Sequence, residues 1–216
     1  MSASDVSVVL VHGAWADGSS WRKVIVALQA AGVTTVAAPL PLTSLADDID
    51  ALDRASERVD GQLVLVGHAY AGAVIGAARS RRVKSLIYVA GLAPAQGETV
   101  ADVFYRAPPH PGAPQLAPDS HGCIWLPSRA FAGAFAQNAT AEEQSLLCAV
   151  QRPISPACIS VAVGRPLWEE RPDDRSADAT VHGRSDEGAS SLASGGPHAA
   201  GQRSFSCSRS HSGSGP

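Results

Sequence analysis

The turn at residues 67–72 constrains the fold of this chain more than any other feature. It reads Gly67-His68-Ala69-Tyr70-Ala71-Gly72, follows the apolar run 63–66 and precedes a segment of small residues. Small residues on both sides of a sharp turn allow a strand and the helix after it to approach closely, since glycine has no Cβ to keep the backbones apart. The turn therefore predicts a buried strand that passes directly into a helix.

Apolar runs and helical patterns alternate around this turn. The strands are predicted at 6–11, 33–38, 63–66 and 83–90. The first is continuously apolar, which is typical of a strand buried on both faces. The helices between them are predicted at 21–31, 44–59 and 69–79, with N-caps at Ser19-Ser20 and Ser44 for the first two. This alternation predicts right-handed βαβ units and a parallel sheet covered by helices on both faces.

A different texture begins near residue 93, where prolines, aromatics and short helical stretches replace the regular alternation. We expect residues 93–152, approximately, to form a lid over the sheet. Helices are predicted within it at 128–135 and 140–150, the second with a capping box formed by Thr140 and Glu143.

The composition changes again near Pro172. The segment 153–168 is expected to be extended, with a weak strand candidate at 159–163. Beyond it the chain is rich in Ser, Gly, Ala, Asp, Arg and His, and its large apolar residues are Val181, Leu192 and Phe205. Such a stretch cannot bury enough apolar surface to offset the entropy of ordering it. We therefore predict one domain over residues 1–172 and a disordered low-complexity tail over 173–216.

The composition of the segment after Pro172 is typical of GC-rich coding DNA that is read out of frame. A change of frame near Pro172 is one hypothesis for the loss of apolar strands, and the other two frames of the gene test it. If the last strands of the sheet are absent, the strand at 83–90 becomes an unprotected edge, which favours aggregation.

Composition excludes several function classes. The chain has 216 residues, 17 basic and 20 acidic, and a formal charge of −3, so no patch for nucleic acid or anionic membranes is indicated. We expect a small-molecule ligand. The N-terminus has no basic region before its short apolar run, which predicts a cytoplasmic protein. The four cysteines are scattered, so neither a metal site nor a disulfide framework is expected. No cofactor is expected either, and the oligomeric state is open.

Two turns together carry a family resemblance. The stretch 9–15, which ends in His12-Gly13-Ala14-Trp15, follows the first strand, and the turn at 67–72 follows the third. With Trp21 they resemble the esterase and hydroxynitrile lyase branch of the α/β-hydrolase superfamily, over residues 6–172. The resemblance implies an α/β-hydrolase-type, mostly parallel sheet flanked by helices, with a lid insertion and a truncated or disordered C-terminal part. A dinucleotide-binding fold fits less well. The turn after the first strand lacks the Gly-X-Gly-X-X-Gly motif, and Trp15 would lie near the phosphate site.

In this family the turn at 67–72 is the nucleophile elbow, and Ala69 stands where the serine is expected. The resemblance also implies an oxyanion hole built from the backbone N–H groups of Ala14 and Tyr70, which a substitution at position 69 need not remove.

Three further side chains are expected near the ligand. His12 is expected to support the first loop, and His68 to form part of the pocket wall. Trp125 of the lid, with Phe104 and Tyr105, is expected to line an apolar pocket.

The remaining triad positions lack predicted strands to carry them. Asp173, Asp174, Asp178 and His182 are the right residue types but fall in the predicted tail. Removing a triad nucleophile or base costs on the order of 10⁶ in turnover. We therefore expect a hydrolase of esters or related small carbonyl compounds by ancestry, with impaired catalysis. One alternative is a non-catalytic protein that binds a small ligand. Another is a lyase or cofactor-free reaction driven by a His base.

Overall fold

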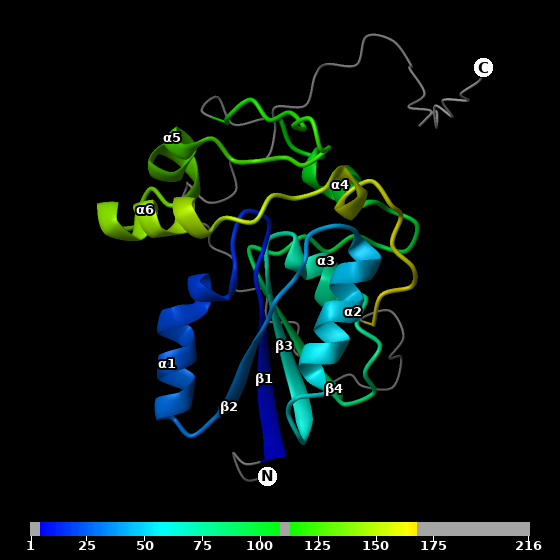
Figure 1. The fold of residues 1–216 in the computed structure, drawn as a ribbon. Helices are drawn as coiled ribbons and strands as arrows, with labels where there is room; N and C mark the ends of the chain where they lie inside the picture. The colour runs from blue at the N-terminus through cyan, green and yellow to red at the C-terminus, as the bar shows by residue number, and fades with distance from the viewer. Residues whose placement is uncertain (1–4, 109–112, 168–216) are drawn as a thin grey trace, which may run out of the picture.

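The computed structural model describes residues 5–108 and 113–167. Its centre is a four-stranded sheet in the order β2-β1-β3-β4, in which every neighbouring pair is parallel. The strands are β1 Val6–Val11, β2 Thr34–Ala38, β3 Gln62–His68 and β4 Val83–Val89. The predicted parallel α/β architecture is thereby confirmed (Figure 1).

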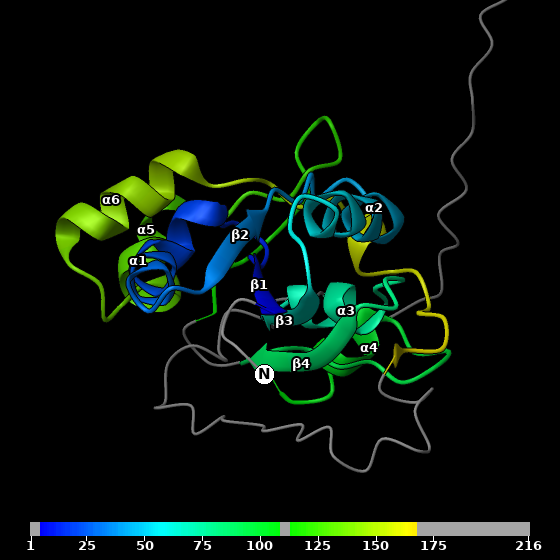
Figure 2. The same ribbon diagram turned by 90° about the horizontal axis from the view of Figure 1, so that it is seen from below.

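Helices cover the two faces of the sheet unequally. The helix α1 (Arg22–Ala30) and the 3-10 turn η2 (Gly18–Trp21) pack on the face formed by Val8, Leu10 and Val66. The helices α2 (Leu45–Ser56) and α3 (Ala71–Gly76) pack on the opposite face, where the larger core cluster lies (Figure 2).

The lid passes over the carboxyl ends of the strands (Figure 1). Its elements are α4 (Val100–Phe104), α5 (Ser128–Ala130), the π-helical turn η3 (Phe131–Phe135) and α6 (Ala141–Val150). The predicted capping box at the start of α6 is present, with the backbone N–H of Glu143 donating to Thr140 Oγ1 at 3.2 Å.

Three predictions of local structure need correction. Asp17, rather than Ser19-Ser20, caps the first helical segment, because its carboxylate accepts the backbone N–H of Ser19 at 2.9 Å. The helix after the turn is shorter than predicted and covers Ala71–Gly76, since residues 69 and 70 belong to the turn itself. The strand candidate 159–163 forms only an isolated bridge between Ala162 and Thr99, after the 3-10 turn η4 (Pro156–Cys158).

Some predictions lie outside the described residues, namely the tail 173–216 and its acid and histidine candidates. In the described part, no strand pairs with the outer edge of β4. The same part holds no helix that is long and apolar enough to cross a bilayer. Nor do its His, Cys, Asp and Glu side chains gather in threes where they could hold a metal ion.

Candidate active site

The strand-to-helix turn at residues 67–72, here called the elbow, has the strained backbone that such a turn requires. Ala69 has a φ of 50°, in the left-handed region that costs a residue with a Cβ of order 1–3 kcal/mol. Three backbone hydrogen bonds hold it there. Its N–H donates to the carbonyl of Val89 at 3.2 Å, and its own carbonyl accepts the N–H groups of Gly72 at 3.0 Å and Leu92 at 2.9 Å.

The two glycines of the elbow are required by close backbone approach. A Cβ at position 67 would lie 2.7 Å from the carbonyl oxygen of Ala71, and one at position 72 would lie 2.5 Å from that of Leu92. Real Cβ atoms do not come so close to backbone oxygens. The glycines therefore let β3, α3 and the segment after β4 pack tightly around residue 69.

The loop after β1 lies directly against the elbow. A Cβ at position 13 would be 3.0 Å from the carbonyl oxygen of His68 and 3.2 Å from the Cβ of Ala69. The two predicted backbone donors, Ala14 and Tyr70, are the next residues in the chain after Gly13 and Ala69, which approach each other here. Among the described residues neither N–H has a hydrogen-bond acceptor. Their role as an oxyanion hole stays a prediction that this geometry permits.

His12 supports the first loop through both ring nitrogens. Its Nδ1 lies 2.9 Å from the carbonyl oxygen of Gly13, and its Nε2 lies 3.2 Å from the backbone nitrogen of Leu40. Since a carbonyl only accepts and an N–H only donates, the ring is neutral with its proton on Nδ1. Burial lowers the pKa of His12. With 1% of its surface exposed and both nitrogens engaged, the side chain holds backbone rather than offering a group to a ligand.

His68 is the titratable side chain that lies next to Ala69 in the chain. It is half-buried, and its ring meets the Trp21 indole edge-on, with centroids 6.4 Å apart. Burial lowers the pKa of His68, so the neutral ring is favoured at pH 7. Its place in a pocket wall stays a prediction.

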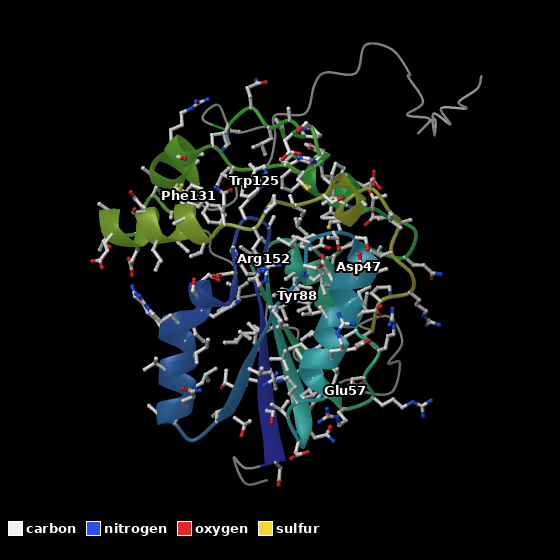
Figure 3. The ribbon with its side chains drawn as sticks, viewed as in Figure 1. Asp47, Glu57, Tyr88, Trp125, Phe131 and Arg152 are labelled. Atoms are coloured by element: carbon white, nitrogen blue, oxygen red, sulfur yellow. The ribbon has the colours of Figure 1, made fainter. Side chains whose placement is uncertain are left out.

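Trp125 lies at the surface of the lid. It is 47% exposed, and its indole N–H donates to Asp119 Oδ2 at 3.0 Å. Figure 3 labels Trp125 in the lid. Tyr105 is also exposed and packs edge-on against Phe104, with centroids 5.0 Å apart. The expected role of these lid aromatics as a pocket wall stays a prediction. The most deeply buried lid aromatic is instead Phe131, at 1% exposure.

A buried carboxylate behind the elbow was not predicted from the sequence. Asp48 of α2 has no exposed surface, and its Oδ2 accepts the hydroxyl of Tyr70 at 2.7 Å. A signal was present in the sequence, because Asp48 lies at helical spacing from Leu45 and Leu52 on the apolar face of α2. An acidic residue on such a face needs buried donors.

The fold and the elbow together define an α/β protein. Its turn between β3 and α3, at the carboxyl ends of the strands, holds residue 69 at the apex. A sequence model described as the alpha/beta hydrolase family matches residues 8–205. The chain belongs to this family. No curated protein sequence matches the chain.

Solved structures agree with this fold. A variant of tomato methylketone synthase I in complex with beta-ketoheptanoate superposes with a TM-score of 0.60 at 18% identity, covering 69% of this chain and 67% of that chain. An extracellular alpha/beta-hydrolase from a Paenibacillus species, described as sharing homology with tobacco salicylic acid binding protein 2, gives 0.57 at 18% identity, covering 74% and 71%. A pyrethroid hydrolase from Sphingobium faniae JZ-2 gives 0.55 at 20% identity, covering 73% and 71%. At these identities the likeness concerns the fold alone.

Proposed function

We propose that this chain descends from a hydrolase of esters or related small carbonyl compounds and that its covalent catalysis is impaired. The observation that carries this proposal is Ala69 at the apex of the elbow, with a φ of 50° and a methyl group as its side chain. Covalent hydrolysis needs a nucleophile, a base to accept its proton and an acid to orient the base. A methyl group supplies no nucleophile.

The elbow and the loop after β1 each keep one backbone donor. The N–H groups of Ala14 and Tyr70 lie on two segments in contact, and neither has an acceptor within the described part of the chain. Such groups donate hydrogen bonds to a carbonyl or carboxylate oxygen without a covalent step. This favours binding of a small carbonyl compound as the second candidate function. The methylketone synthase complexes with beta-ketoheptanoate and 2-tridecanone support that ligand class by analogy of fold.

A binding experiment tests this proposal. The ¹H–¹⁵N shifts of the protein are followed while 2-heptanone, a water-soluble methyl ketone, is added. We expect saturable shifts at the amides of Ala14 and Tyr70. The control variant is Ala69→Asn, because asparagine tolerates a positive φ and places its amide where the carbonyl would lie. Absence of shifts at these two amides, or equal shifts in Ala69→Asn, contradicts carbonyl binding at the elbow.

A further inference from the structure

A single buried carboxylate joins three segments that are far apart in the chain. Asp48 Oδ1 accepts the backbone N–H of Leu42, in the loop after β2, at 2.7 Å. Its Oδ2 accepts the hydroxyl of Tyr70, on the elbow, at 2.7 Å, and lies 3.6 Å from the Sγ of Cys158 in η4. Asp48 and Cys158 have no exposed surface, and Tyr70 retains 3%.

This cluster surrounds a buried carboxyl group with hydrogen-bond donors. Burial raises the pKa of Asp48, while the hydrogen bonds from Tyr70 and Leu42 oppose that rise. Burial also raises the pKa of Cys158 to about 12, so its thiol stays protonated and can donate. A buried carboxylate without such donors would be strongly destabilising. The three donors therefore bind the loop, the elbow and η4 to α2.

The connection to Tyr70 bears on the strained residue beside it. The left-handed conformation of Ala69 persists only if its surroundings fix it. The backbone hydrogen bonds of Ala69 to Val89, Gly72 and Leu92 fix this residue directly. The next residue is fixed by its side chain, because the Tyr70 hydroxyl is anchored on α2.

We propose that Asp48 is a positioning residue for the elbow, which acts through the Tyr70 hydroxyl to hold the backbone of Ala69 and the N–H of Tyr70 in place. This inference deepens the proposed function and rests on it where it concerns ligand binding. Asp48 has no exposed surface, so its action on a ligand is indirect. Its effect is transmitted by one hydrogen bond and the packing of the tyrosine ring.

The test uses Tyr70→Phe, Asp48→Asn and the double variant, with Ser56→Ala as the control. Ser56 is another buried polar residue of α2. In the described part of the chain its hydroxyl bonds within its own helix, to the Leu52 carbonyl at 2.9 Å. Amide hydrogen exchange is measured at Ala69, Gly72 and Leu92 relative to Val9 in the central strand. We expect about tenfold lower relative protection at the elbow in both single variants, as the loss of one net hydrogen bond allows. No such loss is expected in Ser56→Ala.

The double variant separates positioning from general destabilisation. If Asp48 acts through Tyr70, the double variant loses no more elbow protection than Tyr70→Phe alone. The proposal is overturned if the elbow amides of Tyr70→Phe and Asp48→Asn are as well protected as those of Ser56→Ala. It is also overturned if the losses of protection in the two single variants add up in the double variant.

A binding measurement separates a failure of the positioning role from a failure of the proposed function. The dissociation constant for 2-heptanone is measured for the same proteins, and we expect it to rise about tenfold in Tyr70→Phe and Asp48→Asn. If the elbow amides lose protection but the wild-type protein binds no 2-heptanone, the positioning role stands and carbonyl binding is wrong. If the wild-type protein binds the ketone and both variants bind it equally well, the positioning of the Tyr70 N–H is wrong.

Discussion

The indole N–H of Trp15 donates a 3.0 Å hydrogen bond to the backbone carbonyl of Ile124, so the loop after β1 is joined to the lid. Trp15 is buried and has a φ of 57°. It follows Ala14 directly, and the loop it belongs to lies against the elbow at Gly13. The arrangement of the first loop and the seating of the lid are therefore coupled through one side chain.

Replacing Trp15 with phenylalanine tests this coupling. The variant keeps an aromatic ring but leaves the Ile124 carbonyl without its donor, so we expect a loss of about 1–2 kcal/mol in the free energy of unfolding. We also expect faster limited trypsin cleavage after Arg129 of the lid, at a temperature where both proteins are folded. Cleavage at the wild-type rate would mean that the hydrogen bond does not hold the lid.

The glycine at position 72 gives a sharper test of the elbow. In Gly72→Ala the new Cβ would stand 2.5 Å from the carbonyl oxygen of Leu92, so backbone must move. We expect a destabilisation of about 2–3 kcal/mol, measured by urea unfolding. Gly133→Ala is the matched control, because nothing lies within 4 Å of a Cβ there. Equal stability of the two variants would contradict the close packing of the elbow against the segment after β4.

An ion pair between lid and core predicts a pH dependence. Lys23 of α1 lies 2.8 Å from Glu143 of α6, and its hydrogen bond is the largest of the influences that lower the pKa of Glu143 to about 2. A carboxylate whose folded pKa is depressed stabilises the protein above its unfolded value of 4.5 and loses that contribution as the pH falls toward 2.

We therefore expect Glu143→Gln to unfold at a lower temperature than wild type at pH 6, and the difference to shrink between pH 4.5 and pH 3. The neighbouring Glu142→Gln is the control, because its carboxylate enters neither ion pair of this contact. One molar NaCl should also reduce the difference, since Lys23 is largely exposed. A difference that stays constant with pH would show that the ion pair is not its cause.

The outer edge of β4 predicts self-association. In the described part of the chain no strand pairs with it, and Ile87 and Val89 of this strand are 40% and 38% exposed. Exposed apolar edge strands invite pairing with other chains, and lysine on an edge opposes it. We expect Ile87→Lys to lower concentration-dependent association in light scattering, with Val26→Lys on the exposed side of α1 as control. If both variants associate like wild type, another surface is responsible.

Much of the fold was predictable from the sequence because it rests on apolar runs and caps. The strand at 6–11 and the helix beginning after Ser44 have strong local signals, and both are confirmed. The cap at Asp17 was missed because Asp17, Ser19 and Ser20 are all good N-cap residues, and only the backbone geometry chooses among them.

The site was less predictable because it depends on contacts between distant segments. The elbow is a local pattern, so its strained backbone at Ala69 follows from sequence. The partner of Tyr70 is 22 residues away, and only the packing of α2 against α3 brings Asp48 to it. Lid aromatics carry no local signal that separates core from surface, which is why Trp125 is exposed while Phe131 is buried.

Steady-state hydrolysis of a short-chain activated ester, 4-nitrophenyl acetate, tests the central claim most directly. Wild type and Ala69→Ser are compared with buffer and with Gly133→Ala, a variant remote from the elbow. We expect wild type to stay at the buffer rate, because the methyl group of Ala69 cannot attack the ester. We expect no efficient turnover from Ala69→Ser either, since the acid and histidine of a triad have no predicted strands to carry them. Wild-type turnover well above the buffer rate, suppressed by saturating 2-heptanone, would contradict the central claim.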